Sequence, residues 1–187
     1  MSEVDDLSDA AARGDLQRAR GLLEDGADPN AANSNGRTAI QVMMMDDAKM
    51  AQLLLDYSAN PNVPDPDSGR FPAHDAAQQG FLDTLTVMMM DDASMAQLLL
   101  DYSANPNVPD PDSGRFPAHD AAQQGFLDTL IVLLTGKAHI HIPDKTGRLP
   151  LDLAPDHIVA ALQSLGIVTD SKKHIMQDTM EPMIRLH

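Results

Sequence analysis

The hydrophobic positions of this chain form short stretches with helical spacing, separated by polar loops that contain Gly, Asn and Pro. Loops of this kind, at 25–30 (DGADPN) and 58–62 (SANPN), follow stretches suited to helices around 16–24 and 48–57. Asp46 and Asp47 precede the second of these stretches and are natural N-caps for it. The pattern therefore predicts an all-α chain of short helices joined by polar loops.

A repeat interval is marked by Gly-Arg pairs, each followed by a short apolar stretch. The pairs begin at Gly36, Gly69, Gly114 and Gly147, so they lie 33, 45 and 33 residues apart. In three of the four following stretches a Pro occupies the first helical turn, where its missing N–H costs nothing. A period of 33 residues is typical of the ankyrin repeat, a β-turn finger followed by two antiparallel helices. We therefore expect an ankyrin-repeat solenoid.

The repeat interval divides residues 1–165 into five units. We expect them at about 4–36, 37–69, 70–114, 115–147 and 148–165, followed by a flexible tail over 166–187. In the first unit an inner helix is expected around 8–13, with Ser8 or Asp9 as its cap. In the second unit about one turn is left for the first helix, because residues 40–45 run into Asp46. In the fifth, Pro155 stops the first helix early, and 156–165 forms the second.

A near-identical duplication interrupts the 33-residue interval. Residues 42–86 return as 87–131, with Lys49 replaced by Ser94 and Thr86 by Ile131. The third unit therefore carries twelve surplus residues. Two arrangements follow: a single helix from about 81 to 102, or a break at 91–92 that gives a three-helix unit. The break is favoured, because the same Asp-Asp pair must start a helix in the second unit. In either case we expect a local mis-step of the solenoid that weakens the coupling of its two halves.

Composition limits the partners that the chain can have. Its formal charge of −15 repels phosphates, so we expect no nucleic-acid binding and favour a basic protein surface. Cysteine is absent, which excludes disulfides and Cys-ligated zinc. No apolar run approaches membrane-spanning length, and the acidic N-terminus lacks a signal-peptide pattern. We expect a monomer of the cytoplasm and nucleus that does not bind membranes.

The sequence shows no pattern of catalytic or cofactor-binding residues. P-loop, Gly-x-Ser-x-Gly and His-Glu-x-x-His motifs are absent, so we expect no enzyme, no cofactor and no metal. His139 and His141 alternate as exposed finger residues would, and the acidic run from Asp65 suits a finger tip better than a calcium loop. The triplet Met43–Met45 has two interpretations, as filler of an irregular core or as a partner contact. Three residues in a row cannot all point inward, so at least one should be exposed.

Several strings go beyond the general repeat pattern and resemble one family. Residues 40–45 (IQVMMM) and 74–85 (HDAAQQGFLDTL) are similar to the ankyrin-repeat inhibitors of cyclin-dependent kinases 4 and 6. Further matches are 10–14 (AAARG), 26–30 (GADPN) and 147–154 (GRLPLDLA), so the resemblance covers about residues 8–165. A shortened first helix in the second unit is also a trait of that family.

The resemblance implies inhibition by binding. Family members lay repeats two and three beside the ATP cleft of the kinase and weaken its binding of cyclin and ATP. Carried onto this chain, Asp75 is the acid expected to pair with a kinase arginine, and Asp120 is its duplicate. The other expected contact residues are Asn33, Asn35, Met43, Met44, Met45, His74, Asp83 and Asp128.

Other roles remain open for these residues and for the chain. Asp75 could serve as a local cap, and His74 could hydrogen-bond the backbone within the repeat. The geometry favours the Asp75 copy as the binding one, because the units before it keep the normal interval. The alternative function is an ankyrin scaffold or adaptor without kinase inhibition, whose site is disrupted by the duplication.

Overall fold

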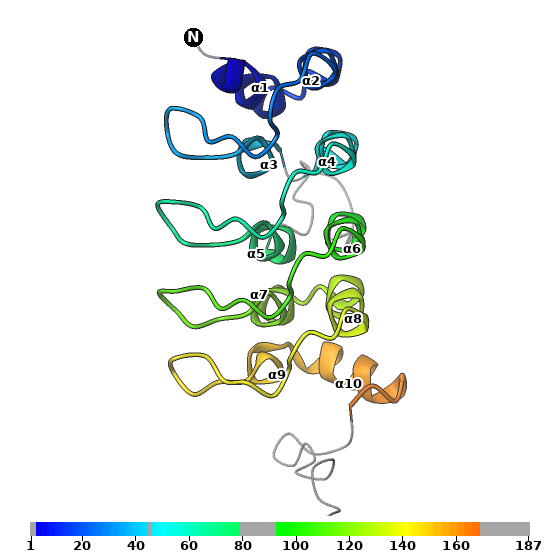
Figure 1. Cartoon of the computed structure of the whole chain (residues 1–187). Helices are drawn as coiled ribbons and strands as arrows, with labels where there is room; N and C mark the ends of the chain where they lie inside the picture. Colours follow the sequence, from blue (N-terminus) through cyan, green and yellow to red (C-terminus); the bar gives the residue numbers. More distant parts are fainter. Residues whose placement is uncertain (1–2, 45, 79–92, 169–187) are drawn as a thin grey trace, which may run out of the picture.

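The computed structural model describes residues 3–44, 46–78 and 93–168 of the chain. These residues form ten helices and a series of long loops. The helices stack as two columns, an inner column of odd-numbered and an outer column of even-numbered helices, and the loops project from the inner side as fingers (Figure 1). Their bounds are α1 Glu3–Ala12, α2 Leu16–Glu24, α3 Ala39–Val42, α4 Ala48–Asp56, α5 Pro72–Gln78, α6 Ser94–Asp101, α7 Pro117–Gln124, α8 Leu127–Thr135, α9 Pro150–Leu153 and α10 Asp156–Ser164. The predicted all-α ankyrin solenoid is confirmed.

Local sequence sets where most helices begin and end. Asp47 caps α4 by accepting a hydrogen bond from the Met50 N–H at 2.9 Å. The helix before it, α3, is four residues long, as the sequence predicted. Pro155 lies between α9 and α10, so the early stop in the last unit is also confirmed.

The first helix starts earlier than predicted. α1 begins at Glu3, so Ser8 and Asp9 lie inside it and the proposed cap is wrong. Acidic residues early in the helix favour this start, because negative charge is stabilising near a helix N-terminus. One of them, Asp6, also holds the Arg18 guanidinium of α2 at 2.8 Å.

The duplicated region keeps the stack regular. α6 begins at Ser94 and Ala93 lies in a turn, so a single helix from 81 to 102 is wrong. The alternative break at 91–92 lies outside the described residues. α6 contacts α5 within its unit and lies between α4 and α8 in the outer column (Figure 1). The expected mis-step is therefore also wrong for the described residues. The apolar face of α6 repeats that of α4, so it fills the next position in the column.

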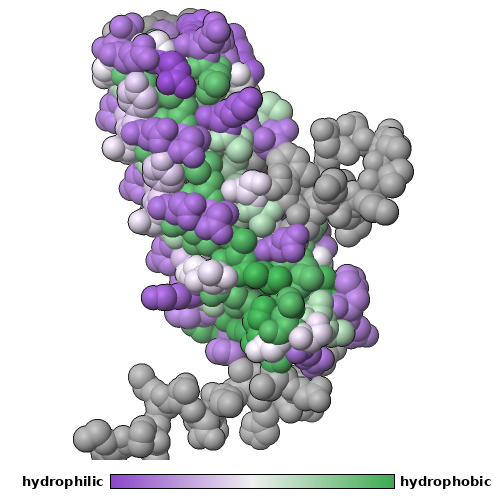
Figure 2. Space-filling view, turned by 90° about the vertical axis from the view of Figure 1, so that its right-hand side faces the viewer, coloured by the Kyte–Doolittle hydropathy of each residue, from purple (hydrophilic) through white to green (hydrophobic). Residues whose placement is uncertain are grey.

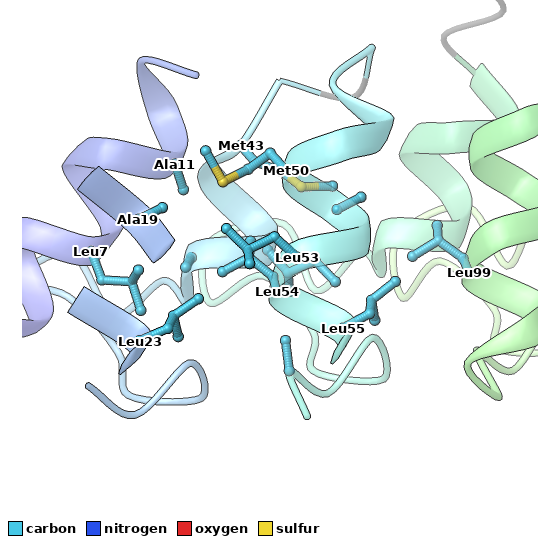
Figure 3. Close-up of a cluster of buried hydrophobic side chains, with 14 of the residues drawn as sticks. Leu7, Ala11, Ala19, Leu23, Met43, Met50, Leu53, Leu54, Leu55 and Leu99 are labelled. Atoms are coloured by element: carbon cyan, nitrogen blue, oxygen red, sulfur yellow. The ribbon is translucent and has the colours of Figure 1, made fainter. Parts of the chain in front are cut away.

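The core is made of small and aliphatic side chains in two clusters. The first runs from Leu7 to Ala104 and includes Leu54 and Leu99, both fully buried (Figure 3). The second runs from Ala77 to Val168 along α7 to α10. The two clusters meet within the third unit, where Ala76 belongs to one and Ala77 to the other. Val168 is buried, so the described start of the predicted tail packs on the last unit.

A polar ladder of asparagines joins successive units across this boundary. In each step one Asn side chain donates to a backbone carbonyl of the next unit at 2.9 Å, and its Oδ1 accepts a backbone N–H two residues later at 2.7 Å. The three asparagines are Asn30, Asn62 and Asn107. Because the third step links the third unit to the fourth, the ladder connects the two hydrophobic clusters.

The outer face carries both polar and apolar side chains. Polar residues cross it in bands, and its lower end is more hydrophobic (Figure 2). On α8, Leu127, Ile131 and Leu134 are only partly buried against the second cluster. α6 exposes polar positions such as Gln97 and Asp101 and also carries the partly buried Leu98.

Candidate functional site

The inner helices α5 and α7 begin with the same residues, Pro-Ala-His-Asp, and the backbone fixes both histidines. His74 Nδ1 accepts the Phe71 N–H at 3.4 Å, and its Nε2 lies 3.2 Å from the Arg115 carbonyl oxygen. His119 is held in the same way, at 3.1 Å from the Phe116 nitrogen and 3.1 Å from the Arg148 oxygen. Because Nδ1 is the acceptor, Nε2 carries the proton and donates to the next repeat.

Both histidines are structural rather than surface residues. Their exposed fraction is 0%, so His74 has the backbone role that was its alternative interpretation and does not itself present a contact surface. Burial lowers the pKa of His74 to about 4, against the opposing effect of its carbonyl acceptor. Burial also lowers the pKa of His119. Both rings are therefore neutral at physiological pH.

Asp75 lies in the first turn of α5 and is partly exposed to solvent. Its side chain is 38% exposed, and its Oδ1 lies 3.5 Å from Arg70 Nε. Partial burial raises the pKa of its carboxyl, while the Arg70 guanidinium lowers it. A partly exposed carboxylate in the first turn of a helix can accept a charge-assisted hydrogen bond from a partner cation.

Asp120, the duplicate of Asp75, occupies a different environment. Its exposed fraction is 3%, and it lies between two arginines, 3.1 Å from Arg70 Nη2 and 3.7 Å from Arg115 Nη1. Burial raises the pKa of its carboxyl, and the two guanidinium groups oppose that effect. In this arrangement Asp120 binds within the stack and is closed to a partner.

The preceding inner helices differ between the two copies. α7 packs beside α5, which has seven residues, whereas the inner helix before α5 is α3, with four. The preceding arginines also differ. Arg70 pairs with both Asp110 and Asp120, whereas Arg37 pairs with Asp65 at 2.7 Å and Asp67 at 3.1 Å. The structure thus leaves open the aspartate of the first copy, the one favoured from the sequence.

Arginines of the Gly-Arg pairs link each finger to the finger that follows it. Arg70 Nη1 lies 3.2 Å from Asp110, and Arg115 Nε lies 3.7 Å from Asp144. A hydrogen bond from the Thr146 hydroxyl, at 2.6 Å, lowers the pKa of Asp144. This role of the arginines was not predicted from the sequence, in which they served only as markers of the repeat. Their spacing, matched by an acid in each following finger, was the available signal.

The methionine triplet is divided between core and surface. Met43 is 4% exposed and belongs to the first hydrophobic cluster (Figure 3), whereas Met44 is 52% exposed. Met45 lies outside the described residues. Met43 is therefore core filler, and Met44 meets the expectation that at least one methionine of the triplet is exposed, while its contact with a partner stays a prediction.

The finger asparagines differ in the same way. Asn33 is partly buried, and its Oδ1 accepts the backbone N–H groups of Asn35 at 2.9 Å and Arg37 at 3.0 Å. Its carboxamide oxygen therefore shapes the finger. Asn35 is exposed at the tip and available for contacts.

The remaining predicted contact residues lie elsewhere. Asp128 is exposed in the first turn of α8, in the outer column, so it does not share the inner face with Asp75. Asp83, its duplicate in the first copy, lies outside the described residues. Among the residues that the structure describes, no group of three or more His, Asp or Glu could hold a metal ion. No described helix is long and apolar enough to cross a membrane.

Comparisons with known proteins agree with the repeat architecture and with the resemblance stated from the sequence. The family model for ankyrin repeats in three copies matches residues 7–95. The chain is 58% identical over 79 residues to human cyclin-dependent kinase 4 inhibitor B, covering 42% of this chain and 57% of the relative. It is 57% identical over 82 residues to human cyclin-dependent kinase inhibitor 2A, covering 44% and 53%. For cyclin-dependent kinase inhibitor 2A of Monodelphis domestica the identity is 56% over 79 residues, covering 42% and 46%.

The matches therefore span about half the length of these relatives. All three are named as kinase inhibitors rather than as enzymes, in agreement with the expectation that this chain is not an enzyme. Together with the stacked helix pairs, the matches support an ankyrin-repeat fold, and over these residues the chain is similar in sequence to proteins named as cyclin-dependent kinase inhibitors.

Proposed function

We propose that this chain is a protein-binding inhibitor of cyclin-dependent kinase 4, 6 or both. The observation that carries the proposal is a partly exposed aspartate, Asp75, in a stack similar in sequence to proteins named as inhibitors of cyclin-dependent kinase 4 or of cyclin-dependent kinases. The packing of α5 against α6 and α7, and of α4 against α6, supports it, since a binding face needs its repeats held together. The chain acts as a monomer in the cytoplasm and nucleus.

Binding combines one charge contact with apolar contacts. Asp75 accepts a hydrogen bond from a kinase arginine, and the exposed Met44 packs against an apolar part of the kinase surface. The formal charge of −15 speeds association with a basic surface and makes it depend on salt. Occupation of this site by the inhibitor hinders cyclin and ATP binding and so restrains G1 progression.

The test is a titration of the chain against purified cyclin-dependent kinase 6, without cyclin. Asp75→Asn should weaken binding roughly 30-fold or more, because a charged hydrogen bond at the centre of an interface is a typical hot spot. Asp112→Asn is the matched control, since it removes the same charge from an exposed finger residue. It should leave affinity within about twofold at physiological salt.

Two results would contradict the proposal. A folded chain that does not bind either kinase, or that does not inhibit cyclin-bound kinase in a phosphorylation assay, is a scaffold. Salt-sensitive binding of another basic protein that survives Asp75→Asn identifies an adaptor with a different site.

A further inference from the structure

Arg70 is shared between the two duplicated aspartates. Its Nη2 lies 3.1 Å from Asp120 Oδ2, its Nη1 3.2 Å from Asp110 Oδ2, and its Nε 3.5 Å from Asp75 Oδ1. Nη2 also donates to Gln78 Oε1 at 3.2 Å. Of the three carboxylates, Asp75 therefore receives the longest contact, from the single Nε–H.

The other two carboxylates hold the guanidinium away from the open surface. Asp120 is 3% exposed and Asp110 is 6% exposed, so both contacts are made inside the stack. A guanidinium has five N–H donors in a rigid planar fork, so fixing both terminal nitrogens also fixes the direction of Nε. The side chain of Arg70 is 21% exposed and cannot turn fully toward Asp75 while both contacts hold.

We propose that Asp120 is a positioning residue for Asp75: by holding Arg70 in the stack it keeps the Asp75 carboxylate available to a partner's cation. The inference rests on the proposed function and adds a role for the second copy. Asp120 does not bind a second partner. Instead it holds Arg70, which would otherwise compete with the partner for Asp75.

Arg70 and a partner arginine compete for the carboxylate of Asp75. A partner arginine and Arg70 are both cations that can pair with Asp75, and whichever is better placed reduces the gain from the other. If Asp120 loses its charge, Arg70 loses its partner at 3.1 Å and turns toward Asp75. The partner must then displace a stronger internal pair.

The main experiment is a binding cycle with purified cyclin-dependent kinase 6 as the probe. Asp120→Asn keeps the side-chain shape and should weaken binding about threefold to tenfold, although residue 120 is buried. In an Arg70→Gln background the same substitution should have no effect on affinity, because the competitor is gone. Unfolding of each variant is measured by circular dichroism, and affinities are compared only between chains fully folded at the titration temperature.

A loss of affinity from Asp120→Asn that is equally large with and without Arg70 would overturn the proposal, since it would reflect a general structural effect. Unchanged affinity in Asp120→Asn would overturn it as well. Asp112→Asn is the control for net charge and should match the parent chain in both backgrounds.

A second measurement does not depend on the partner. In chain labelled with ¹³C at aspartate carboxyls, NMR titration follows the pKa of Asp75 directly. Asp120→Asn should lower it, because Arg70 moves closer, and should not lower it in the Arg70→Gln background. If the parent chain fails to bind the kinase, the proposed function fails, and this titration still decides whether Asp120 controls the Arg70–Asp75 pair.

Discussion

Residues 70–78 and 115–123 have the same sequence but different surroundings. Each begins with an arginine, continues through Pro-Ala-His-Asp and forms an inner helix, and each histidine is fully buried. The aspartates differ, with side-chain exposures of 38% for Asp75 and 3% for Asp120. In a solenoid each unit contacts its neighbours, so the unit before a helix determines which of its side chains can reach a partner. Here a one-turn helix precedes Asp75 and a longer helix precedes Asp120.

The outer helices α4 and α6 are also copies of one another, but one pair of their equivalent side chains is equally buried. α4 and α6 have nearly the same sequence, and Leu54 and Leu99 occupy equivalent, fully buried positions. Leu54→Ala and Leu99→Ala should each lower the free energy of unfolding by about 3 kcal/mol, as for other buried leucines. Denaturant unfolding measures both values. A cost for Leu99→Ala below about 1 kcal/mol would mean that α6 does not occupy its position in the column.

The two aspartates should differ in their contribution to stability. Asp120→Ala leaves Arg70 and Arg115 without a shared buried acceptor and should lower the free energy of unfolding by about 3 kcal/mol. Asp75→Ala removes a partly exposed contact and should cost less than about 1 kcal/mol. Urea unfolding at pH 7 measures both changes. Equal losses of unfolding free energy in the two variants would contradict the difference between the two aspartates.

Acid should destabilise the chain through its buried histidines. The pKa of His74 is about 4 in the folded chain, against an ordinary value of 6.5 in the unfolded chain. At a pH between these two values the unfolded chain therefore binds more protons than the folded chain. The free energy of unfolding therefore falls as the pH is lowered through this window, by about 2 kcal/mol between pH 7 and 5 from His74 alone. His119 acts in the same direction, and the raised pKa values of Asp75 and Asp120 act against it.

The chain itself suggests the control for this pH dependence. Gln41 occupies the position equivalent to His74 in the second unit, where its Oε1 accepts the Thr38 N–H at 2.8 Å. His74→Gln should therefore fold and should lose part of the pH dependence in urea unfolding at pH 5 and 7. An unchanged pH dependence in this variant would show that His74 is not the responsible group.

The smallest predicted effect concerns the helix ends in the two copies. Ser58 and Ser103 follow the ends of α4 and α6 with φ of 68° and 65°, a left-handed conformation that costs a non-glycine residue energy. Ser58→Gly and Ser103→Gly should each raise the free energy of unfolding by about 0.5–1 kcal/mol. Thermal unfolding would show equal gains at the two sites if both caps are formed, and a gain at only one would contradict their equivalence.

Features that depend on a few neighbouring residues were predictable from the sequence. The 33-residue interval indicated the helix pairs, Asp47 indicated the start of α4, and Pro155 the end of α9. The exposure of Asp120 and the position of α6 were not predictable in this way. Both copies have the same residues there, so local preferences are equal, and contacts with units before and after decide the outcome. The role of Arg70 depends on acids 40 and 50 residues further along the chain.

Of the two aspartates with the same local sequence, Asp75 is accessible to a partner and Asp120 is buried. Isothermal titration calorimetry of the chain against purified cyclin-dependent kinase 6 tests it most directly, because it reports both affinity and stoichiometry. The account predicts one kinase per chain, with binding weakened roughly 30-fold or more by Asp75→Asn. Two kinases per chain, or one kinase bound with affinity unchanged by Asp75→Asn, would contradict it.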